Sequence, residues 1–151
     1  MLRLRAFLAG IAVLGAATLA TAAPAGAIGS STACTGVIKI ARMAFRPPAV
    51  APGNSSTVHV LAVNCTDRNH STTVTWLGRF IGTGGQVPQG CPIIDPVSEA
   101  ANFVPHGSFA GKLTYLVPAG CTATVLRVTA RFSEGGAILT QRSANLTIIH
   151  P

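Results

Sequence analysis

The side chains that could perform catalysis in this chain are few and scattered. The sequence holds four Asp and Glu residues, four histidines and eleven Lys and Arg residues. Acid-base or nucleophilic catalysis needs a carboxylate or an imidazole beside its partner in one cleft. Asp95 and Glu99 are the only carboxylates close together in sequence, and the Pro-rich segment around them does not fix their separation. His106 and Ser108 form an isolated His-x-Ser that is more typical of a solvated loop end.

Catalytic sequence motifs are also absent. No Gly-x-Ser-x-Gly elbow, P-loop or His-Glu-x-x-His motif occurs. We therefore expect a protein that is not an enzyme and uses no cofactor.

The four cysteines have spacings that favour disulfides over metal binding. Cys34, Cys65, Cys91 and Cys121 form no Cys-x-x-Cys pair, and the histidines are dispersed. Zinc sites are usually built from closely spaced pairs of such ligands. Four cysteines in an exported protein of this size are typical of two disulfides. We therefore expect two disulfides and no metal site.

The segment Gly-Cys-Pro-Ile-Ile-Asp-Pro, residues 90–96, is the strongest candidate for an interaction site. It lies in a Gly- and Pro-rich section, residues 81–107, that we expect to be irregular. Irregular loops longer than about 12 to 15 residues are often functional in compact domains. A disulfide at Cys91 and the nearby prolines would make this loop rigid, so that it loses little freedom on binding. The candidate interaction residues are Pro92, Ile93, Ile94 and Asp95.

Two adjacent isoleucines on an extended loop cannot both easily face the core. We expect one of Ile93 and Ile94 to face inward and the other to be covered by the loop or offered to a partner.

The window Cys-Pro-Ile-Ile-Asp-Pro-Val, residues 91–97, resembles the reactive-site region of the secreted bacterial subtilisin-inhibitor family. In that family Cys-Pro precedes the scissile pair and Asp-Pro-Val follows it. The resemblance implies that Ile93 and Ile94 flank the scissile bond. It covers seven residues, with one residue missing before Asp-Pro and a different spacing of the first cysteine pair. Another 30 residues follow Cys121, where the family's chain nearly ends.

The N-terminus has the pattern of an export signal. Arg3 and Arg5 precede an apolar run, residues 6–20, and the following residues end in an Ala-x-Ala pattern. We expect residues 1–27 to be a signal peptide cleaved near Ala27, and residues 28–151 to form one secreted domain without a membrane span. The high content of Ala, Gly, Pro and Arg is typical of a bacterium with a GC-rich genome.

The charge outside the signal peptide is positive but dispersed. Nine Lys and Arg residues against four carboxylates give a net charge of about +5. The basic residues occur singly, without the interleaved aromatic side chains on which single-stranded nucleic acids stack. We therefore expect no nucleic-acid partner. An extracellular protein or a cell-wall polysaccharide fits this balance better.

The elements that position these residues are strands. Apolar residues alternate with polar ones between clusters of Gly, Pro, Asn and Ser, and no helical apolar stripe appears. In residues 72–80, Val74, Trp76 and Phe80 share one face, so we expect Trp76 in the core rather than exposed to a sugar. The expected strands are residues 35–45, 57–65, 72–80, 108–117, 121–132 and 137–149.

The number of short strands predicts the fold class. We expect an all-β, antiparallel β-sandwich of immunoglobulin-like size, stapled by two disulfides, with a small β-barrel as the alternative.

The strands also favour one pairing of the cysteines. If the first two strands form a hairpin turning at residues 48–52, opposing residues have numbers summing to about 99, as Cys34 and Cys65 do. The rival pairing of Cys65 with Cys121 would resemble the immunoglobulin inter-sheet bridge. That bridge is accompanied by a Tyr two residues before the second cysteine, and Ala119 stands there. We therefore expect the pairs Cys34–Cys65 and Cys91–Cys121.

These patterns together predict a secreted, non-catalytic binding or structural module that acts outside the cell. The alternative is a proteinaceous inhibitor of an extracellular hydrolase, using the Cys91–Pro96 loop.

Overall fold

The computed structural model describes residues 34–151, which consist mostly of β-strands. The expected signal peptide and its cleavage site at Ala27 lie outside the described residues. A short 3₁₀ turn, η1 (Thr83–Gly85), follows the fourth strand. The strands are β1 (Ile38–Arg46), β2 (Ala49–Val50), β3 (Ser55–Asn64), β4 (His70–Ile81), β5 (Val97–Phe103), β6 (Ser108–Leu116), β7 (Val125–Glu134) and β8 (Ala137–Ile148).

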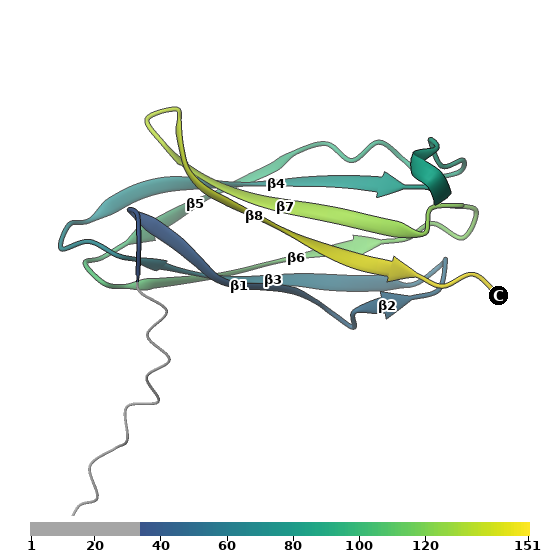
Figure 1. Ribbon diagram of the computed structural model, residues 1–151, viewed down its shortest axis with the longest axis horizontal. Coiled ribbons are helices and arrows are strands. Elements are labelled where there is room, and N and C mark those ends of the chain that lie inside the picture. Colours follow the sequence, from purple (N-terminus) through teal and green to yellow (C-terminus); the bar gives the residue numbers. More distant parts are fainter. Residues whose placement is uncertain (1–33) are drawn as a thin grey trace, which may run out of the picture. The chain divides into compact units, whose positions relative to one another are not determined.

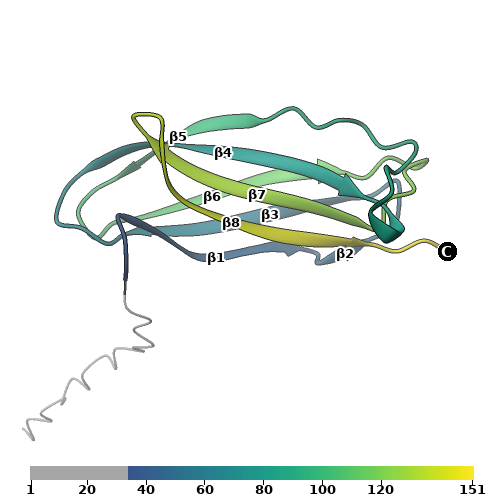
Figure 2. The same ribbon diagram turned by 45° about the horizontal axis from the view of Figure 1, so that its top comes forward.

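The strands form two sheets that pack face to face (Figure 1). One sheet has three strands in the order β1-β3-β6, and the other has five in the order β2-β8-β7-β4-β5. Neighbouring strands are antiparallel, except that the short β2 runs parallel to β8. Figure 2 shows β5 at the edge of the five-stranded sheet, beside β4. The predicted all-β sandwich of immunoglobulin-like size is confirmed.

The core lies between the sheets and is built from alternate residues of each strand. On β4, Val74, Trp76 and Phe80 are buried, as their shared face predicts. On β7, every second residue from Leu126 to Phe132 is fully buried. The ring of Phe132 meets Phe109 of the opposite sheet edge-on, with centroids 5.8 Å apart. The predicted placement of Trp76 in the core is confirmed.

The section of residues 81–107 is not wholly irregular, contrary to the prediction. Residues 97–103 form β5, which pairs with β4 from Trp76↔Val97 to His70↔Phe103. Only Ala101 and Phe103 of this strand are buried. An edge strand that faces solvent at most positions shows little apolar alternation, and the preceding Pro96 is typical of a loop. The sequence pattern therefore gave no sign of β5.

The first hairpin has a different register from the predicted one. Ile40 pairs with Ala62 and Arg42 with Leu61, so opposing numbers sum to 102 before the bulge and to 103 after it, rather than to 99. The register shifts at a β-bulge between Ile40 and Arg42, where Ala41 is the extra residue. The predicted turn also contained residues 49–50, which instead leave the hairpin as β2 and pair with β8. These two features moved the register without changing which strands pair.

Both favoured disulfides are present, which confirms the predicted pairing. The Cα atoms are 5.4 Å apart in Cys34–Cys65 and 4.5 Å apart in Cys91–Cys121. Cys34–Cys65 joins the segment before β1 to the loop after β3, beyond the end of the β1–β3 ladder. Cys91–Cys121 joins the loop before β5 to the loop before β7, at the other end of the sandwich.

Candidate functional site

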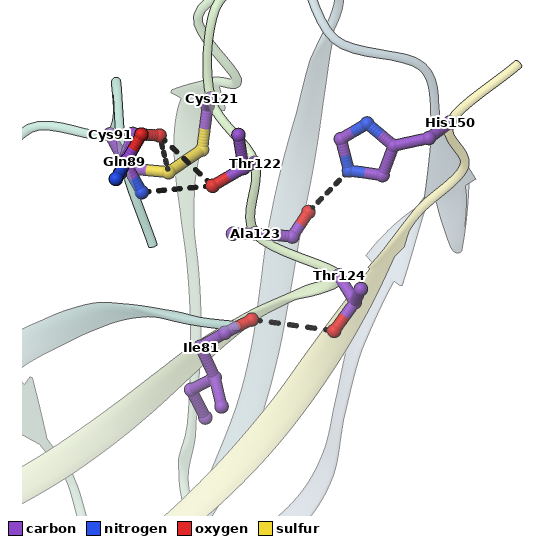
Figure 3. The surroundings of a disulfide bond; sticks show 8 residues. All are labelled: Ile81, Gln89, Cys91, Cys121, Thr122, Ala123, Thr124 and His150. Atoms are coloured by element: carbon purple, nitrogen blue, oxygen red, sulfur yellow. Dashed lines mark hydrogen bonds between the residues drawn. A yellow bond between two sulfur atoms is a disulfide. The ribbon is translucent and has the colours of Figure 1, made fainter. Parts of the chain in front are cut away.

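The predicted interaction loop lies at the end of the sandwich where β4 ends and β7 begins. Residues 82–96 connect β4 to β5, and residues 117–124 connect β6 to β7. Figure 3 shows Cys91 and Gln89 of the first loop facing Cys121 and Thr122 of the second. The Thr122 N–H donates to the Gln89 carbonyl at 2.9 Å, and the Gln89 N–H donates to Thr122 Oγ1 at 2.8 Å. The disulfide and this hydrogen-bonded pair fix the first loop to the second.

Gly90 permits this close approach of the two loops. Its φ of 67° lies in the left-handed region that glycine adopts without steric cost. A Cβ at this position would overlap the carbonyl oxygen of Gly120. Any larger residue would therefore push the two loops apart beside the disulfide.

The two isoleucines of the loop point in opposite directions. Ile93 is 96% exposed, whereas Ile94 is half-buried and packs against the core. Ile94 reaches the sheet at Gly78 of β4, where an added Cβ would lie only 2.9 Å from Ile94 Cδ1. Gly78 therefore leaves the space into which Ile94 inserts. The loop is anchored by one isoleucine and presents the other to solvent, which is one of the two arrangements predicted from the sequence.

The surface beside Ile93 is hollowed. The hollow has a volume of about 340 Å³, and Arg79 is the only charged side chain that lines it. Val87, on its rim, is 88% exposed. Such a recess can accept an apolar side chain of a partner. The Arg79 guanidinium can pair with a carboxylate next to that side chain. The lining residues are Gly78, Arg79, Phe80, Val87, Pro88, Cys91, Pro92, Ile93 and Ile94.

The sequence prediction did not include the contribution of β4 to this site. Of the four predicted residues, Pro92, Ile93 and Ile94 line the hollow, and Asp95 is exposed next to them. Gly78 was the missed signal, because a glycine inside a strand often marks the close approach of another segment.

A polar cluster that was not predicted lies at the opposite end of the sandwich. His70 Nδ1 is 2.8 Å from Glu134 Oε2, and its Nε2 is 3.0 Å from Thr66 Oγ1. The Ser71 N–H donates to the other Glu134 oxygen at 3.0 Å. The hydrogen bond from His70 lowers the pKa of the Glu134 carboxyl, desolvation opposes this, and the Ser71 N–H adds to the lowering. Because the carboxylate is ionised, Nδ1 of His70 is the donor.

The hydroxyl, imidazole and carboxylate of this cluster stand in the order of a nucleophile, a base and its orienting acid. The Thr66 hydroxyl is also bonded within its own loop, to Asn64 Oδ1 at 2.8 Å and from the Arg68 N–H at 3.3 Å. Asn64 is buried, and its amide donates to the carbonyls of Arg68 and Val104. The cluster therefore fixes the loop after β3 against the β7–β8 hairpin.

The other residues singled out in the sequence have separate partners. Glu99 accepts a hydrogen bond from Trp76 Nε1 at 3.1 Å. His106 Nε2 lies 2.6 Å from Asp67 Oδ1, and Ser108 belongs to the β3–β6 ladder. Within residues 34–151, no group of three or more His, Cys, Asp and Glu side chains could hold a metal ion. The same residues contain no helix long and apolar enough to cross a membrane.

Comparison with known proteins identifies the fold only. No family model matches the chain, and no curated protein matches its sequence. The alkylpurine DNA glycosylase AlkC of Pseudomonas fluorescens is similar with a TM-score of 0.53 and 10% identity, over 78% of this chain and 32% of that chain. The C-terminal domain of Wzt is similar with a TM-score of 0.53 and 11% identity, over 78% of this chain and 76% of that chain. The sporulation control protein Spo0M of Bacillus subtilis is similar with a TM-score of 0.53 and 13% identity, over 78% of this chain and 51% of that chain.

This chain thus spans 32% of the glycosylase chain and 51% of the Spo0M chain. At these identities the similarity extends to the arrangement of strands and not to a site.

Proposed function

We propose that this protein is an extracellular, non-catalytic binding module that holds a protein partner through the loop of residues 92–95. The observation that carries the proposal is Ile93, which is 96% exposed on a loop fixed by a disulfide. Burying such a side chain contributes about 1.5–3 kcal/mol, and a rigid loop loses little freedom on binding. Ile93 has the properties of an apolar anchor in a protein interface.

The extracellular location in this proposal rests on two features of the chain. Disulfides form and persist outside the reducing cytosol, and the described domain contains two. The charged and apolar pattern of residues 1–27 supports export as well.

The lining of the hollow beside Ile93 supports a partner of a particular chemistry. Its walls are largely apolar, and Arg79 supplies a single positive charge. The matching segment carries an apolar side chain next to a carboxylate, since a guanidinium pairs well with a carboxylate. The partner is therefore an apolar, acidic stretch of protein.

Selection from a random peptide library displayed on phage tests this proposal. We expect enrichment of apolar, acidic peptides whose affinity for the protein, measured by fluorescence polarisation, falls about tenfold in Ile93→Asp. Ile138→Asp is the matched control, because Ile138 is 55% exposed on β8 and lies outside the loop. Equal binding of the selected peptides by Ile93→Asp and the native protein would refute the proposed site.

A second candidate function, inhibition of an extracellular protease, uses the same loop. The observation that favours it is the placement of Ile93 between the disulfide at Cys91 and the anchored Ile94. A side chain held outward on such a loop can enter the specificity pocket of a protease while the backbone stays extended.

Titration of a subtilisin-like protease separates the two functions. An inhibitor causes stoichiometric loss of protease activity, and Ile93→Pro and Ile94→Pro abolish that loss. Ile138→Pro retains inhibition. Full protease activity at a molar excess of the native protein would end the inhibitor hypothesis and leave the binding module.

A further inference from the structure

The outer face of the three-stranded sheet carries positive charge only. Its outward residues include Arg42 and Arg46 on β1, His59 on β3 and Lys112 on β6. None of the outward residues on these three described strands is Asp or Glu. Three of the four carboxylates of the chain are hydrogen-bonded to side chains elsewhere, and the fourth lies in the loop before β5. Arg42, Arg46 and Lys112 therefore share this face with no Asp or Glu of the same strands.

A β-bulge brings Arg42 to this face. Ile38 and Ile40 point into the core, so strict alternation would send residue 42 inward as well. The extra residue Ala41 reverses the alternation, so that Arg42 is exposed while Met43 and Phe45 are buried. Bulges commonly re-aim a side chain at functional sites.

The bulge is held from the other sheet by Arg142 of β8. Its Nη1 donates to the Ile40 carbonyl at 3.2 Å and to the Ala41 carbonyl at 3.1 Å. These are the carbonyls that the ladder cannot satisfy regularly at a bulge. Arg142 is thus a positioning residue for Arg42.

A hollow of about 230 Å³ lies where the three strands bring basic side chains together. Arg42 stands opposite Leu61, which stands opposite Ala110, and the small Ala110 leaves room above the sheet. In the next row His59 stands opposite Lys112. Arg42, His59 and Lys112, one from each strand, all line the hollow. Arg42 and Lys112 are two like charges that face one hollow, and an anion bound there would pair with both.

The chemistry of this face favours an acidic polysaccharide. A guanidinium binds carboxylate, sulfate or phosphate with two parallel hydrogen bonds, and Lys adds a point charge. Arg46 continues the row of cations about 13 Å further along β1, which suits a chain with repeated anionic groups. The hollow has no Phe, Tyr or Trp side chain for stacking nucleic-acid bases and no exposed large apolar side chain for anchoring a protein.

We propose that the outer face of the three-stranded sheet binds an acidic polysaccharide, with one anionic group held between Arg42, His59 and Lys112. This surface is separate from the loop of residues 92–95. The two activities can therefore be lost independently.

Binding of dextran sulfate, measured by calorimetry at low salt, tests this proposal, with neutral dextran as the uncharged probe. We expect Arg42→Gln and Lys112→Gln each to weaken binding about tenfold, and added NaCl to weaken it further. The matched control is Arg131→Gln, which removes the same charge from the outer face of the five-stranded sheet. Ile93→Asp also leaves dextran sulfate binding unchanged. Equal losses in Arg42→Gln and Arg131→Gln, or equal binding of neutral dextran, would overturn the proposal.

A double-mutant cycle tests the positioning role of Arg142. We expect Arg142→Gln to weaken dextran sulfate binding in the native background and to have no further effect beside Arg42→Gln. Additive losses would show that Arg142 acts only through its own charge. Single-stranded DNA serves as a competing probe. If it binds as tightly as dextran sulfate and depends on the same residues, the face is not selective for polysaccharide and the proposal fails.

Discussion

Tyr115 combines burial with an unsatisfied hydroxyl. Its side chain is buried, and its Oη has no hydrogen-bond partner in the described part of the chain. Burial raises the pKa of this phenol from 10.0 to about 12. The neutral form is therefore favoured in the folded state. The free energy of unfolding is therefore unaffected by this titration below pH 10, and it decreases as the pH rises from 10 toward 12.

Tyr115→Phe should stabilise the protein, because it removes the unpaired hydroxyl and keeps the ring packed against Phe45. We expect a gain of about 1 kcal/mol in the free energy of unfolding at pH 7. Between pH 7 and pH 11, deprotonation of the tyrosine in the unfolded state should lower the free energy of unfolding of the native protein by roughly 1.4 kcal/mol. The variant has no phenol and should not show this decrease. Urea unfolding at both pH values measures this. A less stable variant at pH 7 would mean that the hydroxyl has a partner.

The titration itself can be observed directly. Tyr115 is the only tyrosine in the sequence, so the ultraviolet absorbance of tyrosinate reports on this residue alone. A midpoint near pH 10 in the folded protein would contradict its burial.

Glu134 gives the opposite pH dependence. Its folded-state pKa is lowered below 4.5, chiefly by the hydrogen bond from His70. The resulting stability is present above pH 4.5 and is lost as the pH falls through the lowered pKa. We expect Glu134→Gln to be less stable than the native protein at pH 7, with a difference that shrinks in acid. Asp67→Asn is the control, since its partner His106 is largely exposed. A difference that persists unchanged in acid strong enough to protonate the Glu134 carboxyl would contradict an electrostatic origin.

Among the elements, β4 determines the position of the interaction loop, through Gly78. Gly78→Ala would place a methyl group against Ile94 Cδ1 and the ring of Tyr115. We expect displacement of Ile94, a cost of about 1–3 kcal/mol and faster hydrogen exchange at residues 93–95. Ile94→Ala should largely cancel the effect of Gly78→Ala, because it removes the colliding atoms. Additive costs in the double variant would exclude this contact as the cause.

The elements also show how far the sequence predicts this fold. Alternation located β3, β4, β6 and β7 and the buried face of β4, because each of these strands has one apolar and one polar side. It did not reveal β5, whose residues mostly face solvent, or the bulge at Ala41, since a one-residue insertion has no period. The direction of Ile93 likewise depended on a distant contact between Ile94 and Gly78. Local periodicity in the sequence therefore predicts the strands, whereas the geometry of the candidate site depends on contacts between segments distant in the sequence.

For the whole molecule, the two disulfides should contribute similarly to stability and differently to function. They close rings of nearly equal size, with sequence separations of 31 and 30. On a chain-entropy estimate, removal of either one costs about 3–4 kcal/mol. We expect the Cys34→Ser/Cys65→Ser and Cys91→Ser/Cys121→Ser variants to lose similar amounts in urea unfolding. Only the second should weaken binding of peptides that depend on Ile93. Equal loss of peptide binding in both variants would contradict a local role of Cys91–Cys121.

The same two disulfides also determine how the domain would transmit mechanical tension. A pull applied between residues 34 and 151 crosses from Cys34 to Cys65 and from Cys91 to Cys121 through the sulfur bonds, so residues inside the rings are not stretched. The described segment could then extend to only about half of its contour length. Arg42 and His59 lie in the first ring, and Ile93 and Lys112 lie in the second. Tension would run through β4, β7 and β8 and bypass Ile93 and the three strands that carry Arg42, His59 and Lys112.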